Sequence, residues 1–177
     1  YGSTLGFKHN FARAGKEWTA DGSYIYSINT NTSDYLSQRY DAYNNPKPLQ
    51  GAQRATGGGH SKTYTIQTDY VDPFTKTQKI EFGLRAAIRN YYNWNDNYIQ
   101  NTGTGQYILL PQIGVRYDYR DEVYAAYTTY SQQVKKFSYQ VGVRIESSEY
   151  QGNFLTKNQQ FSNKYPFSFF PSAYLSY

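Results

Sequence analysis

The stretch "FSYQVGVRIESSEY" (residues 137–150) decides the fold class, because apolar and polar residues alternate along it. Its odd positions up to 145 are Phe137, Tyr139, Val141, Val143 and Ile145, and the even ones are Ser138, Gln140, Gly142, Arg144 and Glu146. A period of two residues predicts a β-strand with one apolar and one polar side. In a soluble sandwich the apolar side packs in the core, whereas in an outer-membrane barrel it faces lipid and the polar side faces water.

The aromatic composition favours the barrel. Aromatic residues make up 19% of the chain, with 22 Tyr and 10 Phe, yet the mean hydropathy is −0.82. Tyrosine combines an apolar ring with a polar tip, so it suits a boundary between hydrocarbon and water. Leu, Ile and Val, the usual material of a soluble core, are scarce. A soluble Tyr-rich sandwich that binds carbohydrate remains an alternative.

Charge and cysteine content exclude several classes. The chain has no Cys, so neither a disulfide framework nor a thiolate metal site is expected. Its 18 Lys and Arg exceed its 13 Asp and Glu, but these charges are scattered, which disfavours nucleic-acid binding. No run approaches the roughly 18 apolar residues of a spanning helix. Because the first residue is Tyr1, inside a strand-like run, we expect a processed or truncated chain, or a piece of a larger protein.

Alternation recurs along the chain and predicts about seven strands in all. The further strand-like stretches are residues 1–11, 18–30, 60–71, 79–92, 115–131 and 165–177. Short connectors at 12–17, 72–78 and 132–136 alternate with longer polar segments at 31–59, 93–107 and 151–164. A barrel with short turns at one rim and long loops at the other shows this alternation.

The fold class predicted is therefore all-β, an antiparallel up-and-down transmembrane β-barrel. The strand-like stretches exceed the usual five or six residues of a soluble strand and suit a tilted membrane strand of about 9–11. A hidden eighth strand is conceivable at "QYILLPQIG" (106–114), although Pro111 argues against a central one. In a barrel, Phe137 and the other apolar residues of the opening stretch face lipid.

Three stretches in a fixed order carry a resemblance to a known family. They are "YDYRDEVYAAYTTYS" (117–131), "FSYQVGVRIE" (137–146) and "FFPSAYLSY" (169–177), preceded by "KIEFGLRAAIRN" (79–90). Together they resemble the outer-membrane β-barrel family found among TonB-dependent receptors of Bacteroidetes. The resemblance spans most of the chain and has its best register over the final sixty or so residues.

The resemblance implies a large transporter with an N-terminal plug, an energy-coupling box and a barrel of roughly 22 strands. Here, 177 residues over about seven strands give about 25 residues per strand, so 22 strands would need roughly 550. Residues 1–177 are thus expected to be a single barrel segment without a plug, about a third of the whole. A small complete eight-stranded barrel is the alternative, because an odd strand count leaves edges that lipid does not tolerate.

The implied function is energy-dependent uptake of a scarce nutrient across the outer membrane of a Gram-negative bacterium. The nutrient would be an iron chelate, a glycan, a peptide or a cobalamin-like compound. The implied partners are outer-membrane lipid, the remaining strands and plug of the full-length protein, and an inner-membrane energy-coupling complex. The competing class is a non-transporting barrel, either an adhesin or a structural component of a surface or secretion assembly.

No catalytic site, metal site or cofactor is predicted. "GGGHSK" (57–62) lacks the ending of a phosphate-binding loop, and the two histidines, His9 and His60, have no companion at ligand spacing. Five carboxylates are candidates for a paired or calcium-binding site, and more simply for lumen charges paired with arginine: Asp118, Asp121, Glu122, Glu146 and Glu149. No nucleophile lies beside a recognisable base, so the chain is not expected to be an enzyme.

Ligand binding is expected at the loops and the lumen. "NYYNWNDNY" (90–98) is rich in aromatic and amide side chains, which stack on sugar rings or planar chelates and hydrogen-bond hydroxyl groups. The alternative is an aromatic girdle that passes into a solvated loop. The candidate ligand-binding residues are Tyr92, Trp94, Asn95, Asp96, Tyr98, Arg85, Arg89, Arg144 and Glu146.

Overall fold

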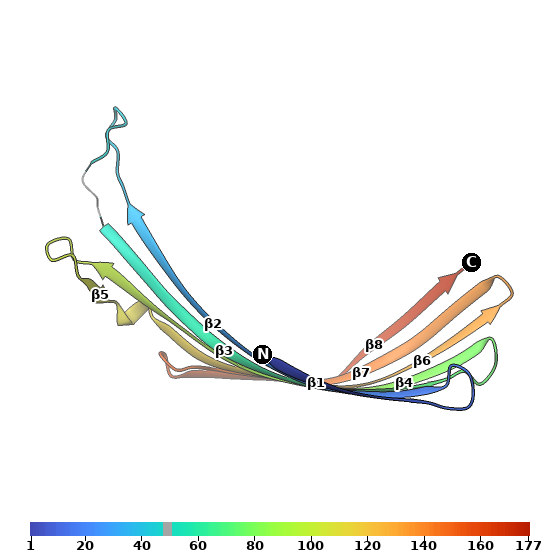
Figure 1. Cartoon of the computed structure of the whole chain (residues 1–177). Helices are drawn as coiled ribbons and strands as arrows, with labels where there is room; N and C mark the ends of the chain where they lie inside the picture. Colours follow the sequence, from blue (N-terminus) through green and yellow to red (C-terminus); the bar gives the residue numbers. More distant parts are fainter. Residues whose placement is uncertain (48–50) are drawn as a thin grey trace.

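The computed structural model describes residues 1–47 and 51–177, which form one curved antiparallel sheet (Figure 1). Its strands are β1 (Gly2–Asn10), β2 (Glu17–Ser37), β3 (Gly51–Asp72), β4 (Gln78–Gln100), β5 (Tyr107–Leu109), β6 (Val115–Val134), β7 (Phe137–Phe154) and β8 (Gln159–Ser176), with a 3-10 turn η1 (Pro111–Ile113). Seven strands lie side by side in the order β1-β2-β3-β4-β6-β7-β8, and β5 pairs only with β4. The seven-strand prediction is confirmed.

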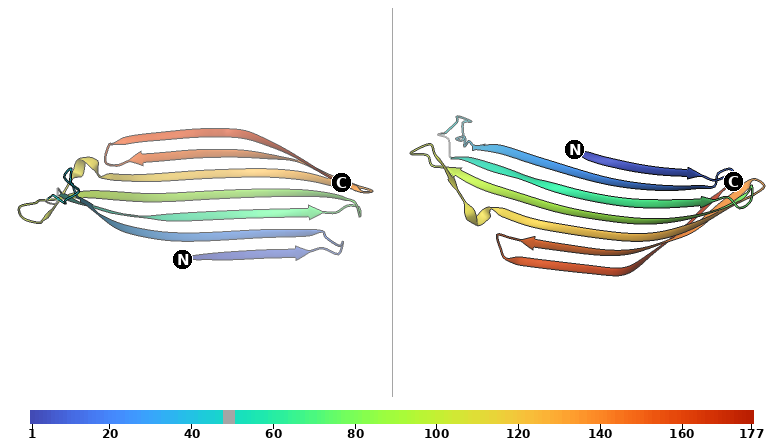
Figure 2. Two further views of the ribbon diagram at one scale, coloured as in Figure 1. Left: turned by 90° about the horizontal axis from the view of Figure 1, so that it is seen from above. Right: turned by 60° about the horizontal axis from the view of Figure 1, so that its bottom comes forward.

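The sheet is a single layer without a core. Among the described residues only two hydrophobic side chains are buried, those of Ala52 and Ala125. The soluble sandwich is therefore wrong, because it needs a second sheet over the apolar face. The sheet is also open: β1 and β8 lie at opposite edges and do not pair, so the described residues form no closed eight-stranded barrel (Figure 2). None of the helical turns described is long and apolar enough to cross a membrane.

Cross-strand register puts the apolar residues of neighbouring strands on one face. Tyr70 of β3 lies opposite Phe82 of β4, which lies opposite Thr128 of β6, and Thr128 lies opposite Val143 of β7. Because directly opposed residues share a face, we call this side the apolar face and the other the polar face. Arg144 and Glu146 lie on the polar face, as the alternation predicts.

The apolar residues form a band of limited height. On β4 the band runs from Ile80 to Ile88, about 27 Å along the strand at about 3.4 Å per residue. On the same face the residues become polar at the upper edge of the band, where Glu122 of β6 lies opposite Ile88. The next row is polar on three strands, with Asn90 on β4, Lys62 on β3 and Arg120 on β6. With a strand tilt of about 40°, the length of the band corresponds to a height of about 21 Å, close to but somewhat less than the apolar belt of about 25 Å that surrounds membrane barrels.

The strands continue well beyond the band, and here the sequence interpretation is wrong. Residues 31–37 and 51–59 extend β2 and β3, and residues 93–100 extend β4, where long loops were expected. Where both faces of a sheet are wet, side chains no longer alternate in polarity, so the strand signal in the sequence disappears. The backbone ladder between β2 and β3 nevertheless continues without a break from Glu17–Val71 to Ser37–Gly51.

The connections also differ from the expected alternation. The turns at 11–16, 73–77 and 135–136 are short and share one end of the sheet, as predicted (Figure 2). At the other end, the connections that contain residues 38–47 and 101–114 are long, but the third connection has only the four residues 155–158. The expected loop at 151–164 is wrong, because β7 and β8 pair as far as Phe154–Gln159. The stretch 106–114 holds the short β5 and the turn η1, not an additional strand of the wall.

Candidate functional site

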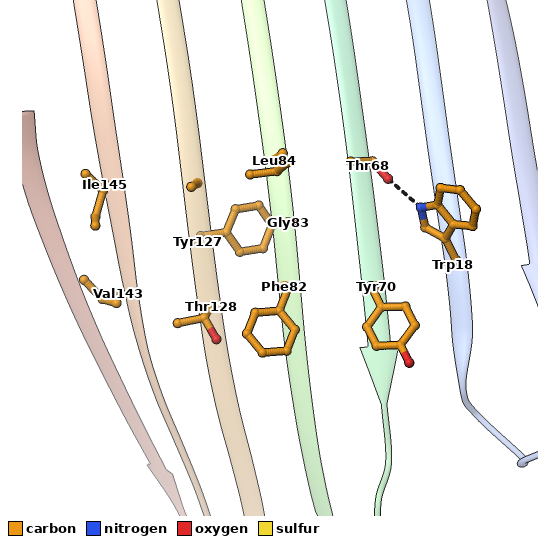
Figure 3. A pocket seen from close by; sticks show the side chains of 11 residues that line it. Trp18, Thr68, Tyr70, Phe82, Gly83, Leu84, Tyr127, Thr128, Val143 and Ile145 are labelled. Atoms are coloured by element: carbon orange, nitrogen blue, oxygen red, sulfur yellow. Dashed lines mark hydrogen bonds between the residues drawn. The ribbon is translucent and has the colours of Figure 1, made fainter. Parts of the chain in front are cut away.

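The apolar face carries a shallow hollow of about 490 Å³ across β2, β3, β4, β6 and β7 (Figure 3). The hollow is lined mainly by apolar side chains, among them Phe82, Leu84, Val143 and Ile145. At its edge the Trp18 indole Nε1 donates a hydrogen bond to the Thr68 hydroxyl, at 2.7 Å. Side chains on this face are strongly exposed, with Ile66 at 66% and Leu84 at 59%. An apolar surface of this extent requires an apolar environment.

On the polar face, a row of interacting side chains crosses the sheet at the height of the band. Asp69, Gly83, Tyr127 and Arg144 lie opposite one another on β3, β4, β6 and β7. The Tyr127 ring lies over Gly83 and its hydroxyl donates a hydrogen bond to the Asp69 carboxylate. The Arg144 guanidinium lies 6.0 Å from the centre of the same ring. This row, which we call the tyrosine row, ties four strands together.

Two further arginines project from the polar face of β4. Arg89 forms an ion pair with Asp121 of β6, with a nitrogen–oxygen distance of 2.5 Å. Arg85 lines a hollow of about 290 Å³ together with Gln67, Tyr127 and Arg144. Arg144 in turn pairs with Glu146 at 2.5 Å. At this height the polar face thus presents hydrogen-bonding groups and mostly paired charges.

Above the band, the polar face carries amides on one side and aromatic rings on the other. We call this surface the amide–aromatic platform. Its members are Asn29 and Asn31 of β2, Gly57 and Gly59 of β3, Tyr91, Asn93 and Asn95 of β4, Tyr117 and Tyr119 of β6, Tyr150 and Phe154 of β7, and Phe161 of β8.

The rings of the platform are close neighbours across four strands. The centre of the Tyr117 ring lies 5.7 Å from that of Tyr91 and 6.0 Å from that of Phe154. The Phe161 ring lies 6.3 Å from both Phe154 and Tyr119. These separations fall in the range of interacting aromatic pairs, so the rings support one another as a continuous surface.

The amides of the platform flank a floor made by glycine. Gly57 and Gly59 of β3 are buried and lie between Asn31 and Asn29 of β2 and Asn95 and Asn93 of β4. A Cβ atom on Gly57 would lie 2.7 Å from the Asn31 side-chain oxygen. The glycines therefore leave the asparagine side chains as the groups that rise from this part of the sheet.

The nine candidate residues from the sequence do not form one site. Arg85, Arg89 and Asn95, together with Arg144 and Glu146, lie on the polar face. The remaining four residues of β4, which are Tyr92, Trp94, Asp96 and Tyr98, lie on the opposite face. Expecting residues 93–98 to form a loop was wrong, because in a strand neighbouring residues point to opposite sides.

The four residues on the opposite face already have neighbours there. Asp96 forms an ion pair with Arg116 of β6 at 2.9 Å. The Tyr92 ring lies 5.4 Å from the His60 ring, which in turn lies 6.1 Å from the Tyr26 ring. This aromatic row, just above the apolar band, agrees with the girdle that the sequence left as the alternative reading of this stretch.

The sequence interpretation missed most of the platform. The sequence analysis assigned two of its rings to a strand, Tyr117 and Tyr119, and two to a loop, Phe154 and Phe161. It placed Asn29 at the end of a strand and Asn31 in a loop. The alternation of side chains would have placed Tyr117 and Tyr119 on one face, because they are two positions apart in the same strand. Their proximity to Phe154 depends on the register of β6 against β7, which no local pattern specifies.

The candidate carboxylates are divided between the faces. Glu122 and Glu149 lie opposite each other on the side of the apolar face, in the row of Ile88 at the upper edge of the band, and each has its own cation: Arg120 at 2.5 Å and Lys164 at 3.0 Å. Asp121 lies on the polar face. Within residues 1–47 and 51–177, no group of three or more His, Asp or Glu side chains could hold a metal ion.

Two contacts hold the long connections in place at the far end of the sheet. Arg54 of β3 donates hydrogen bonds to both carboxylate oxygens of Asp34, at 2.7 and 3.1 Å. Its guanidinium carbon lies 4.5 Å from the centre of the Tyr107 ring of β5, so it also fastens the 101–114 segment. In the segment after β2, Asp41 accepts hydrogen bonds from the backbone N–H groups of Tyr43 and Asn45, both at 2.9 Å.

Acidification should release the turn around Asp41. The hydrogen bonds from Asn45 lower the pKa of the Asp41 carboxyl below its ordinary value. The turn is therefore stabilised at pH values above the ordinary carboxyl pKa, and this stabilisation is lost as the pH falls through the lowered pKa. Hydrogen exchange of peptides covering 40–46, corrected for its intrinsic pH dependence, should show protection at pH 6 that is lost as the pH falls through the lowered pKa of Asp41. The Asp41→Ala variant should lack this protection throughout; equal protection in the two proteins at pH 6 would contradict this role.

Comparison with known proteins identifies the architecture. The model of the outer membrane protein beta-barrel family matches residues 9–177. The chain resembles the ferric citrate transporter FecA in its unliganded form, with a TM-score of 0.60 and 13% identity, over 98% of this chain and 24% of that one. It also resembles the copper transporter OprC, with a TM-score of 0.53 and 12% identity, over 98% of this chain and 27% of that one. The comparison with curated proteins gives no match. The chain thus spans about a quarter of these solved proteins, and the likeness concerns the fold alone.

Proposed function

Because this chain belongs to the outer membrane protein β-barrel family, we propose that it forms part of the wall of a TonB-dependent receptor that takes up a scarce nutrient. Its location is the outer membrane, and the apolar face is the side that meets lipid. The polar face then lines the interior of the barrel. A source among Bacteroidetes remains a prediction from the sequence resemblance.

The observation that carries the proposal is the open sheet with two different faces. Seven strands with an exposed apolar band on one side and paired charges on the other cannot stand alone in lipid, because the edges of β1 and β8 leave backbone groups unpaired. In the receptor proposed here, further strands complete the barrel. The correspondence of nearly the whole chain to about a quarter of FecA and OprC supports a large barrel of the receptor type.

In such a receptor the described residues would contact the nutrient and line part of its path. The strand extensions and the segments at 38–47 and 101–114 would meet the nutrient outside the cell, and the polar face would guide it inward. A plug elsewhere in the full-length protein, driven by an inner-membrane complex, would then open the path. The competing function is a non-transporting barrel that serves adhesion or a surface assembly; no contact among the described residues favours it.

Energy-dependent uptake tests the proposal. The intact gene and a deletion are compared in the source bacterium for accumulation of labelled ferric citrate, cobalamin, a peptide mixture and neutral oligosaccharides. We expect the intact gene to raise accumulation of at least one of these, and a protonophore to abolish the difference, because transport through a plugged barrel requires energy. A correctly inserted protein that changes none of these accumulations would contradict the proposal and favour adhesion or assembly.

A further inference from the structure

The two faces of the strand extensions differ sharply in charge. Above the Arg89–Asp121 pair, the described strands carry no charged side chain on the polar face. The charged residues of the extensions, among them Asp34, Arg54, Lys62, Asp96, Arg116, Asp118 and Arg120, all lie on the other face. The amide–aromatic platform is therefore electrically neutral.

A neutral surface of rings and amides restricts the chemistry of its ligand. An anionic metal chelate is held by cations, and the guanidinium at the lower border of the platform, Arg89, is already neutralised by Asp121. A purely apolar ligand would leave the amides of Asn29 and Asn31 without partners, whereas the Asn95 side-chain oxygen already accepts a hydrogen bond from Asn97 at 2.7 Å. The ligand that suits both groups has apolar faces that stack on rings and many hydroxyl groups that pair with amides.

We infer that the amide–aromatic platform binds a neutral oligosaccharide, an inference that rests on the proposed function and names the nutrient class. Sugar rings present C–H faces to Tyr91, Tyr117 and Phe154, and hydroxyl groups at their edges to the asparagines. The platform crosses six strands, about 24 Å at about 4.8 Å per strand spacing, which is long enough for several sugar units. Its length therefore favours an oligosaccharide over a single sugar.

Binding to the purified full-length protein in detergent tests the inference separately from transport. Isothermal titration calorimetry would use four neutral oligosaccharides of six or seven units, namely a β-1,4-glucan, an α-1,4-glucan, a β-1,4-xylan and an α-mannan, with ferric citrate and Cu²⁺ as comparison ligands. We expect at least one oligosaccharide to bind. Tyr91→Ala and Tyr117→Ala should each weaken that binding roughly two- to tenfold, the range of one aromatic contact.

The matched control is Tyr26→Ala, which removes a half-buried tyrosine at a similar height on the opposite face. It should leave oligosaccharide binding unchanged, and unchanged heat-modifiable migration in all three variants shows that they fold. If no oligosaccharide binds, or if Tyr91→Ala and Tyr117→Ala bind as the parent does, the inference is wrong. Energy-dependent uptake of another nutrient in that case would leave the proposed function standing. The inference of oligosaccharide binding would also be wrong if ferric citrate or Cu²⁺ bound in place of sugar and that binding depended on Tyr91.

Discussion

Replacing Leu84 by arginine in the full-length protein should destabilise the folded barrel by about 2–4 kcal/mol, the cost of an arginine on the lipid side near the middle of the bilayer. Leu84 lies within the apolar band of β4 and is 59% exposed on that face. Its neighbours across the strands are Thr68 and Ala126, neither of which offers a partner for a charge. Urea unfolding of the protein in lipid bilayers, followed by tryptophan fluorescence, measures the loss.

The matched control for this prediction is Ser23→Arg. Ser23 lies on the polar face in the row of Ala87, three residues from the row of Leu84 but still within the height of the apolar band. It is two residues from Asp21 on the same strand and opposite Thr65. An arginine there would project into water, so the free energy of unfolding should change by less than about 0.5 kcal/mol. Equal losses in the two variants would mean that the apolar face does not meet lipid.

Adding one methyl group at Gly83 should cost about 1–3 kcal/mol, the usual penalty of overpacking. Gly83 is buried beneath the Tyr127 ring, and a Cβ atom at this position would overlap that ring. The ring would have to move, which would break its hydrogen bond to Asp69 and its contact with Arg144. Gly83→Ala should therefore loosen the whole tyrosine row.

Gly22→Ala provides the matched control for Gly83→Ala. Both glycines lie within strands and neither has a positive φ, so the added methyl causes no backbone strain at either position. A Cβ atom on Gly22 meets nothing within 4 Å. Alanine is better than glycine inside a strand, so Gly22→Ala should be neutral or slightly stabilising. If Gly83→Ala unfolds at the same urea concentration as Gly22→Ala, the ring position over Gly83 does not contribute to stability.

Much of the wall was predictable because period-two alternation is a local property. The face of Val143 or Arg144 follows from its parity once the residue lies in a strand, and membrane strands are long enough for the pattern to repeat. The same reasoning failed above the band. There, residues such as Asn93 and Gln151 lie in strands whose two faces are both wet, so polarity carries no information about strand or loop.

The candidate site was only partly predictable. The aromatic and amide character of residues 90–98 was correctly noticed, but its members were taken as one cluster. Because neighbouring residues of a strand point to opposite faces, Asn95 lies on the polar face and Trp94 on the other. About half of the residues taken as one cluster therefore lie on the face opposite the platform. The partners that complete the platform, such as Phe154 and Phe161, come from strands more than fifty residues away in the chain.

The sequence by itself determined that this protein is a β-sheet of about seven strands with one apolar and one polar face, because side-chain direction in a strand depends only on position along the chain. The tertiary structure decided how far each strand extends and which residues stand side by side. These features depend on pairing between distant segments, whose register is fixed by the turns and by contacts such as that between Tyr127 and Asp69. The neutral platform exists only because that pairing brings Asn29, Tyr117 and Phe154 into one row.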